Sequence, residues 1–215
     1  MDLFNESTDW EKALKPLILK YKDEKHPLNY KNIYELLVMV VLSAQDSDAH
    51  INNLAPRLFK EFPDMKSLSK ATENSVFPFV KEVKFYQNKT KWLLEIAKSL
   101  KEKKAIPLTL KELTSLKGIG RKSANVIMRE ASTKPEGIMV DLHVIRVAKR
   151  LGISNKKLAD SIEKDMMNVL PRSMWSDIGL SISFLGREIC RPKNPKHSEC
   201  ILNNVCVFCK KENGD

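Results

Sequence analysis

The stretch that decides the fold is Leu113-Thr114-Ser115-Leu116-Lys117-Gly118-Ile119-Gly120-Arg121-Lys122-Ser123-Ala124-Asn125-Val126. Its two glycines flank a single apolar residue, so the backbone can turn tightly with its amide hydrogens exposed. We predict that a helix starts after the second glycine, which points free N–H groups and the positive end of the helix dipole outward together. Such a turn binds a phosphate group without contacting a particular base. We expect Ile119 to anchor the turn in the core and Leu116 to pack beneath it.

Two helices joined by such a turn are typical of a helix-hairpin-helix DNA-binding element. A glycine-x-glycine sequence alone is also compatible with an ordinary connection between two helices. The helical pattern before the turn and the adjacent Arg121 and Lys122 favour the DNA-binding interpretation, because cations strengthen binding to a phosphate backbone. The candidate DNA-binding residues of the turn are Gly118, Ile119, Gly120 and Arg121.

Lys122 has a second candidate role. The helix dipole and Arg121 both disfavour a positive charge at this position, and the neutral amine can attack an electrophilic sugar carbon. By position alone, a lysine that contacts phosphate is the simpler interpretation. Asp141, which stands just before another predicted helix, changes the balance. It can be a plain N-cap, but a carboxylate beside an amine can also take the proton of that amine and stabilise a sugar cation. Lys122 and Asp141 are therefore the candidate catalytic residues.

The composition favours a globular protein with a polyanionic partner. Hydrophobic residues make up 42% of the 215 residues, and 37 Lys and Arg against 27 Asp and Glu give a net charge of +10. This surplus favours nucleic acid or an anionic membrane surface, although a merely basic protein has the same charge. The longest apolar stretch, Leu36 to Leu42, is too short to span a bilayer, and no basic segment followed by an apolar run suggests secretion. We expect no membrane partner and a cytoplasmic protein, associated with the nucleoid if bacterial.

Helical periodicity dominates the chain and no sustained period-two alternation occurs, so the predicted fold class is all-α. Apolar stripes predict helices over about 51–62, 92–100, 158–169 and 175–189. Asp48 is a plausible N-cap for the first of these, and Pro56 within it predicts a kink or an early restart. The continuous apolar run from Leu36 to Leu42 is interpreted as a helix that is buried on every side.

Four segments carry a resemblance to a known family. LKGIGRKSANVI and the following VDLHVIRV resemble the hairpin and catalytic segments of the endonuclease III family, which belongs to the helix-hairpin-helix glycosylases. Residues 42–48, LSAQDSD, resemble its LSAQ-x-x-D segment, and residues 83–89, VKFYQNK, resemble its G-[FL]-Y-x-x-K segment. The motifs follow in the expected order over nearly the whole chain. Lys84, Lys117 and Leu142 stand where the family usually has Gly, Pro and Thr, and we expect them to affect which lesion is accepted.

The resemblance implies two helical lobes with DNA held between them. Residues 26–136 would form a six-helix lobe with the hairpin, and residues 1–25 with 137–215 would form a second lobe that normally holds a [4Fe–4S] cluster in its C-terminal loop, here 190–209.

The resemblance also implies a role for individual residues. Lys122 would be the Schiff-base nucleophile and Asp141 the essential carboxylate. Gln45 would fill the gap left by an extruded nucleotide and Phe85 would wedge into the opposite stack, with Asp48 as a supporting group or a cap. The partner would be double-stranded DNA with a damaged base or an abasic site, and one extruded base requires only a monomer.

The cysteines depart from the family pattern C-x6-C-x2-C-x5-C. Counted from Cys190, the second position is His197, whereas Cys200 and Cys206 fit and Cys209 is an extra thiol. Cys209 can supply the fourth thiolate, or His197 can be the fourth ligand, as nitrogen ligation in Rieske centres allows. Zinc is an alternative to the cluster, and an abandoned site with idle cysteines is the simplest alternative. We favour a [4Fe–4S] cluster on Cys190, Cys200, Cys206 and Cys209.

The leading functional hypothesis is a bifunctional base-excision DNA glycosylase and abasic-site lyase that removes oxidised pyrimidines from duplex DNA. An enzyme of the same fold that removes uracil or thymine from mismatches with guanine is the nearest alternative. The presence of Lys122, and the lack of an acid between Leu37 and Leu42, argue against the adenine-removing sister family. A DNA-binding module without catalysis is the third hypothesis, and it would not require Asp141.

Overall fold

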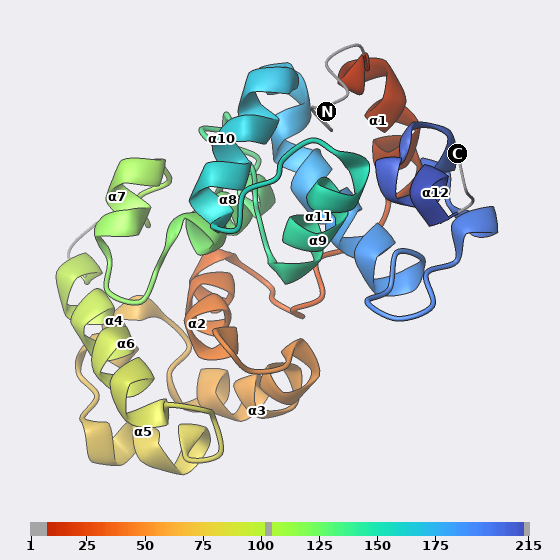
Figure 1. The fold of residues 1–215 in the computed structure, drawn as a ribbon. Coiled ribbons are helices and arrows are strands. Elements are labelled where there is room, and N and C mark those ends of the chain that lie inside the picture. The colour runs from red at the N-terminus through yellow and green to blue at the C-terminus, as the bar shows by residue number, and fades with distance from the viewer. Residues whose placement is uncertain (1–7, 102–104, 213–215) are drawn as a thin grey trace. The chain divides into compact units, whose positions relative to one another are not determined.

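The computed structural model describes residues 8–101 and 105–212, and the regular structure within these ranges is entirely helical (Figure 1). The described residues contain no strand, which confirms the prediction of an all-α fold. The chain divides into two compact units. We call Lys25–Thr133 the hairpin unit, and Met1–Glu24 together with Lys134–Asp215 the terminal unit. The sequence led us to expect the division after residues 25 and 136.

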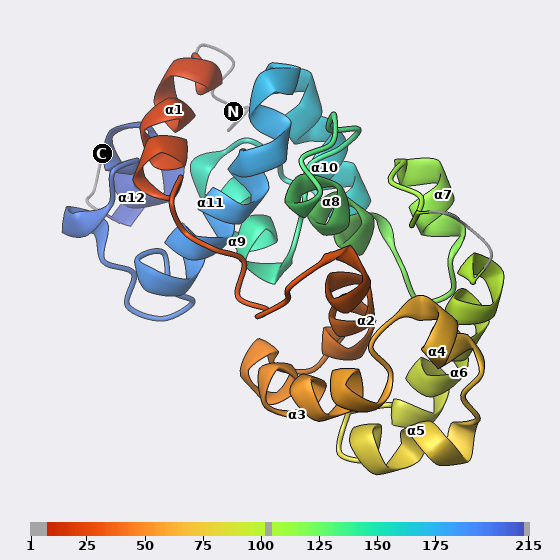
Figure 2. The ribbon, with the colours of Figure 1, turned by 180° about the vertical axis from the view of Figure 1, so that it is seen from behind.

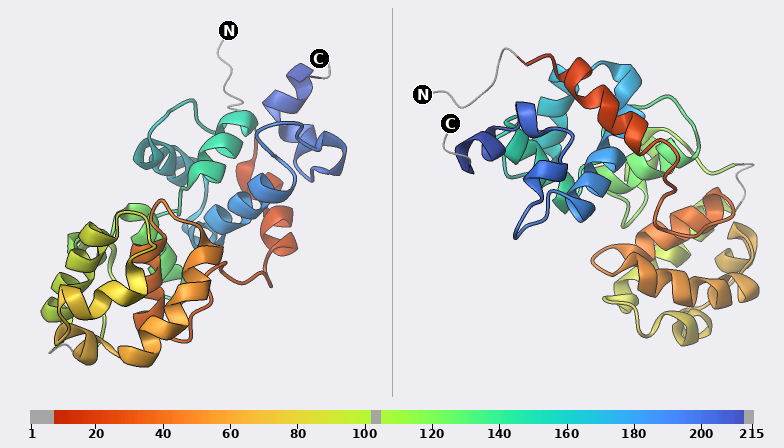
Figure 3. Two further views of the ribbon diagram at one scale, coloured as in Figure 1. Left: turned by 90° about the horizontal axis from the view of Figure 1, so that it is seen from below. Right: turned by 90° about the vertical axis from the view of Figure 1, so that its right-hand side faces the viewer.

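The hairpin unit is built around α2 (Ile33–Ser43), in which every residue from Tyr34 to Leu42 is buried. Helices α3, α6 and α8 contact it, so it has no face left for water, as its continuous apolar run predicts. Figure 3 gives two further views of this packing. The other helices of the unit are α3 (Asp48–Glu61), α4 (Met65–Ser69), α5 (Glu73–Val80), α6 (Tyr86–Leu100), α7 (Leu110–Ser115) and α8 (Arg121–Glu130).

The start of α3 corrects one prediction. Ser47, and not Asp48, is the N-cap, because the Ser47 side chain accepts a hydrogen bond from the backbone N of His50. Of the two outcomes expected at Pro56, a kink or an early restart, the restart does not occur, since α3 runs through this residue. Pro56 lies in the third turn, where the loss of one backbone donor is compensated by the buried side chains of Ile51 and Leu58 on the core face.

The terminal unit combines both ends of the described chain. Its central helix is α11 (Trp175–Glu188), which contacts α9 and α1 (Figure 2). The remaining helices of the unit are α1 (Trp10–Lys20), α9 (Leu142–Leu151), α10 (Ala159–Val169) and α12 (Val207–Glu212), with short 3-10 turns η1 (Arg172–Met174), η2 (His197–Glu199) and η3 (Asn203–Val205). None of the helices in the described residues has the length and apolar character to cross a bilayer.

The predicted apolar stripe over 158–169 is only half right. Ile162 and Met166 are fully buried, whereas Leu158 is 72% exposed and Val169 is 42% exposed. Leu158 precedes the first turn of α10 and Val169 ends the helix, so neither residue lies on the part of the helix that packs against the core.

Candidate active site and cysteine cluster

The hairpin connects α7 to α8 as the sequence predicts. Ile119 is 4% exposed, and its backbone N donates to the carbonyl of Leu116, which closes the turn. Gly120 is the N-cap of α8 and offers no side chain to the amides of the first turn. The first N–H groups of a helix have no partner inside the helix, so this end of α8 is suited to an anionic ligand.

Gly118 has no room for a side chain. Its φ of +78° lies in the left-handed region, and a Cβ placed there would stand 2.5 Å from the ring of Trp92 in α6. Trp92 therefore fixes the position of the turn against α6 and explains why glycine is needed at 118. Gly120 is different, since nothing lies within 4 Å of a Cβ added to it.

A cavity of about 770 Å³ brings together most of the predicted DNA-binding residues. Gln45 and Phe85 lie on its lining with the hairpin residues Gly118, Ile119 and Gly120. Three separate segments of the hairpin unit thus meet at one hollow in its surface. Arg121 does not line this cavity.

Lys122 lies in the first turn of α8, and its residue is exposed. Burial lowers the pKa of His26, and the nearby charges of Lys122 and Arg129 act in the same direction. The amine is thus held on a rigid helix and open to solvent, which suits a nucleophile that must reach a large substrate.

Asp141 is the N-cap of α9. Its Oδ1 accepts hydrogen bonds from the backbone N of His143 at 2.9 Å and of Val144 at 2.8 Å. Its Oδ2 accepts a hydrogen bond of 2.6 Å from the hydroxyl of Ser183 in α11. Asp141 therefore does cap α9, the structural role considered for it. The cap holds the carboxylate in a fixed orientation at the positive end of this helix. Lys122 belongs to the hairpin unit and Asp141 to the terminal unit.

The four cysteines gather around one small cavity of about 20 Å³ in the terminal unit. None of them forms a disulfide, and Cys206 and Cys209 are buried. Burial raises the pKa of the Cys200 thiol, and the nearby thiols of Cys190, Cys206 and Cys209 raise it further. As they stand, no three His, Cys, Asp or Glu side chains among residues 8–101 and 105–212 form a metal-binding group. The cavity has room for about one water molecule.

His197 also lines this cavity, but its Nε2 is 2.5 Å from Oε2 of Glu212 and its ring packs on Phe208. Arg150 donates a hydrogen bond of 3.2 Å to Sγ of Cys190 and stacks on Phe208, 4.4 Å from the ring centroid. A cation beside a thiol stabilises the thiolate form that binds metals. Nε2 of His197 is thus already engaged, whereas the Cys190 thiol has a cation beside it.

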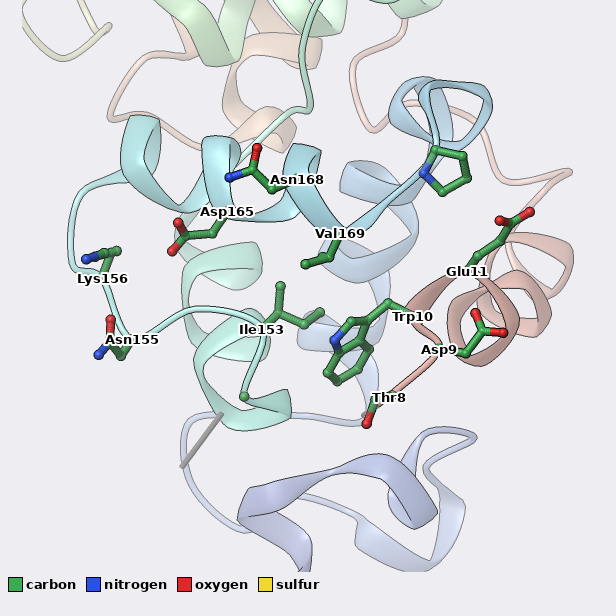
Figure 4. A pocket seen from close by; sticks show the side chains of 12 residues that line it. Thr8, Asp9, Trp10, Glu11, Ile153, Asn155, Lys156, Asp165, Asn168 and Val169 are labelled. Atoms are coloured by element: carbon green, nitrogen blue, oxygen red, sulfur yellow. The ribbon is translucent and has the colours of Figure 1, made fainter. Parts of the chain in front are cut away.

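A second large cavity, of about 590 Å³, lies in the terminal unit (Figure 4). Side chains from the start of α1, the loop after α9, and α10 surround it, among them Trp10, Ile153 and Asp165. None of the predicted site residues lines it.

Sequence reasoning missed the residues that hold the predicted ones in place. Ser183 on Asp141 and Trp92 behind Gly118 are examples, and Asp46 is a third, which accepts a hydrogen bond from the backbone N of Lys84. An acidic residue next to Gln45 was visible in the sequence, but its partner 38 residues away was not.

Comparison with known proteins agrees with this geometry. Residues 38–172 match the model of the HhH-GPD superfamily base excision DNA repair proteins. The chain is 32% identical to endonuclease III of Synechocystis sp. over 194 residues, which cover 88% of this chain and 89% of the relative. A solved non-covalent endonuclease III–DNA complex is 30% identical, with a TM-score of 0.85, and covers 97% of this chain and 99% of its own. A trapped endonuclease III–DNA covalent intermediate is 31% identical, with the same TM-score, and covers 96% and 99%. The chain belongs to the endonuclease III family within the HhH-GPD superfamily of base excision DNA repair proteins.

Proposed function

We propose that this protein removes oxidised pyrimidines from duplex DNA and then cleaves the strand at the abasic site, with Lys122 as the nucleophile. The observation that carries the proposal is the pair of Lys122, exposed in the first turn of α8, and Asp141, held by three hydrogen bonds at the start of α9. Both stand at the family's matching motif positions. A related enzyme has been trapped as a covalent intermediate with DNA, which supports a covalent mechanism.

The hairpin and the cavity beside it would grip the DNA. The backbone at Gly118 and Gly120, with the charge of Arg121, would bind phosphate without reading a base. Ile119, whose own amide donates to Leu116, would hold the turn in place. Gln45 would occupy the space of the extruded nucleotide, and Phe85, which is 52% exposed, would wedge into the stack. A partly exposed aromatic ring at a cavity mouth is suited to stacking on a base.

The first chemical stage would release the base. The lone pair of the Lys122 Nζ forms a bond to C1′, while the bond from C1′ to the base nitrogen breaks and its electron pair leaves with the base. The Asp141 carboxylate would take the proton that the amine loses and stabilise the positive charge that develops on the sugar. A proton from the medium completes the departing base.

The second stage would cut the strand. The C1′–O4′ bond breaks as the nitrogen lone pair forms a C1′=N double bond, and O4′ leaves with the electron pair and takes a proton from the medium. The resulting iminium ion makes a proton on C2′ acidic. Loss of that proton allows the C3′–O bond to break, and the electron pair leaves with the 3′ phosphate. Hydrolysis of the iminium returns Lys122 as a free amine.

Cys190, Cys200, Cys206 and Cys209 would hold a [4Fe–4S] cluster. The support is that all four line one cavity and that Glu212 already occupies the Nε2 of His197. Bound there, the cluster would cross-link the segment after α11 and so stabilise the terminal unit. Zinc bound by the same four thiolates is the alternative, and analysis of the iron content distinguishes the two.

One extruded nucleotide needs one active site, so we propose that the enzyme acts as a monomer. Its working compartment would be the cytoplasm, at the nucleoid in a bacterial cell, where its DNA substrate lies.

Borohydride trapping tests the mechanism. Duplex DNA with an abasic site is incubated with the native protein, Lys122→Ala or Lys111→Ala, and borohydride reduces any iminium to a stable adduct. We expect the adduct with native protein and with Lys111→Ala, whose lysine lies in α7 outside the first turn of α8. Its loss in Lys122→Ala would establish the nucleophile. A folded native protein that binds this duplex without forming an adduct would refute the lyase mechanism.

A further inference from the structure

Gln45 and Phe85 share an unusual backbone conformation. Each has φ of 59°, in the left-handed region that residues other than glycine seldom adopt. The conformation costs about 1–2 kcal/mol per residue, and it persists where neighbouring structure holds it. The two residues lie 40 positions apart in different loops of the hairpin unit, yet both line the same cavity. Something must therefore hold both loops in place.

The carboxylate of Asp46 links the two loops. Its Oδ2 accepts a hydrogen bond of 2.9 Å from the backbone N of Lys84, the residue before Phe85. Its Oδ1 accepts from the backbone N of Ser47 and lies 2.8 Å from Nδ1 of His50, in the first turn of α3. One side chain thus connects the residue after Gln45 with the residue before Phe85.

The charge of Asp46 suits this role. Burial raises the pKa of Asp46, but the hydrogen bonds from Lys84, His50 and Ser47 outweigh it and hold the pKa below its ordinary value. The side chain is therefore ionised at neutral pH. Hydrogen bonds to an ionised acceptor are about twice as strong as those between neutral groups.

Lys89 provides a second connection on the other side of Gln45. Its side chain is almost completely buried, and its Nζ donates a hydrogen bond of 2.7 Å to the carbonyl of Leu42, near the C-terminal end of α2. Helix α6, which begins directly after Phe85, is in this way fastened to α2, which ends just before Gln45. Lys89 occupies the lysine position of the family segment. Asp46 occupies a position that the LSAQ-x-x-D pattern leaves open, so the family motif does not account for it.

We propose that Asp46 is a positioning residue that couples Gln45 and Phe85, so that the two side chains enter the DNA duplex as one preformed element. The proposal rests on the proposed function, in which these residues fill the gap and wedge the stack. With Asp46 in place, its hydrogen bonds offset the free-energy cost of the two left-handed conformations before DNA binds. Without it, each loop relaxes separately, and DNA has to restore both conformations on binding.

Amide exchange tests the connection without DNA. Asp46→Ala removes the acceptor of the Lys84 amide, so we expect this amide to exchange at least about tenfold faster, as loss of one charged hydrogen bond implies. Asp64→Ala is the matched control, because Asp64 also accepts a backbone hydrogen bond in the hairpin unit but caps α4 instead. The Lys84 amide should be unchanged in this control. A Lys84 amide that exchanges equally slowly in Asp46→Ala would overturn the proposal.

A double-mutant cycle tests the coupling on DNA. The probe is a duplex with a stable tetrahydrofuran analogue of an abasic site, and affinity is read from fluorescence anisotropy. We expect Phe85→Ala to weaken binding about tenfold in the native background, as for loss of a base–aromatic stack, and less than about threefold when Asp46 is already Ala. Equal losses in both backgrounds would show that Asp46 does not couple the loops.

The same proteins separate this proposal from the lyase mechanism. A native protein that binds the tetrahydrofuran duplex but gives no borohydride adduct on a natural abasic site refutes the mechanism, while the affinity cycle still decides the role of Asp46. If Asp46→Ala unfolds more easily than Asp64→Ala, the double-mutant cycle is repeated with Asp46→Asn. This variant keeps the size of the side chain but removes its charge.

Discussion

The hydroxyl of Ser183 donates a hydrogen bond of 2.6 Å to Oδ2 of Asp141, across 42 residues of sequence. Ser183 is 1% exposed in the middle of α11, so its hydroxyl is shielded from bulk water. With Oδ1 fixed by two backbone amides, both oxygens of the carboxylate have defined donors. The orientation of the proposed catalytic carboxylate is thus set by two helices, α9 through its amides and α11 through Ser183.

Ser183→Ala should slow base release about tenfold or more, because the loss of a hydrogen bond to a charged group costs about 1.5–3 kcal/mol. The measurement is single-turnover release of an oxidised pyrimidine from duplex DNA. Ser181→Ala is the matched control, since Ser181 is also buried in α11 but donates to the Asp177 carbonyl of its own helix. A native rate in Ser183→Ala would show that the amides alone orient Asp141.

Gly118→Ala and Gly120→Ala should separate folding from DNA binding. Gly118→Ala forces a left-handed alanine against Trp92 and should lower the free energy of unfolding by about 1–3 kcal/mol. Gly120→Ala meets no atom within 4 Å and has extended backbone, so stability should hardly change. If the backbone at 120 contacts phosphate closely, affinity for duplex DNA should nevertheless fall. Unchanged affinity in a stable Gly120→Ala would place the phosphate elsewhere.

Cys209→Ala should abolish the iron–sulfur cluster, whereas His197→Ala should retain it. The reason is that Cys209 is buried against the cavity, and Nε2 of His197 is engaged by Glu212. Iron and sulfide content and the visible absorption of protein purified without oxygen give the answer. The reverse pattern would identify His197 as the fourth ligand, and zinc in place of iron in the native protein would exclude the cluster.

Acid should destabilise the protein through His26. Burial lowers the pKa of His26 to about 4 from its ordinary 6.5, against the opposing charges of Glu130 and Asp48. The unfolded chain therefore binds a proton between these values that the folded chain does not, and stability is lost as the pH falls from about 6.5 towards 4. The Nδ1 of His26 accepts a hydrogen bond from the backbone N of Leu28, which protonation would break.

His26→Gln should reduce the fall in Tm between pH 7 and pH 5 relative to native protein. Asp64→Ala is the control, because it alters stability without removing a histidine. The part of the fall in Tm that His26 causes between pH 7 and pH 5 should persist in this variant. An identical pH dependence in native protein and His26→Gln would mean that the folded protein does not disfavour protonation of His26.

The features that could be predicted from sequence are those set by local pattern. The glycine turn before α8 and the buried run of α2 both follow from residues close to one another in the chain. The N-cap of α3 was misplaced by one residue, because Ser47 and Asp48 are both good caps and the choice depends on backbone geometry.

The features that could not be predicted join distant segments. Asp46 meets Lys84 and Ser183 meets Asp141 only after the helices have packed, and neither pair leaves a periodic signal. The proposed reactive residues were therefore visible in the sequence, while the residues that orient them were not.

The division of the chain also bears on how it is made. The contacts of the hairpin unit lie within one continuous stretch, so they can all form once residue 133 has left the ribosome. Helix α1 is synthesised earlier, yet its packing partner α11 begins only at Trp175. During the synthesis of more than 150 intervening residues, Leu14 and Leu17, fully buried in the finished protein, have no native partner on α11. The apolar face of α1 thus has no α11 to pack against until that later helix has been made.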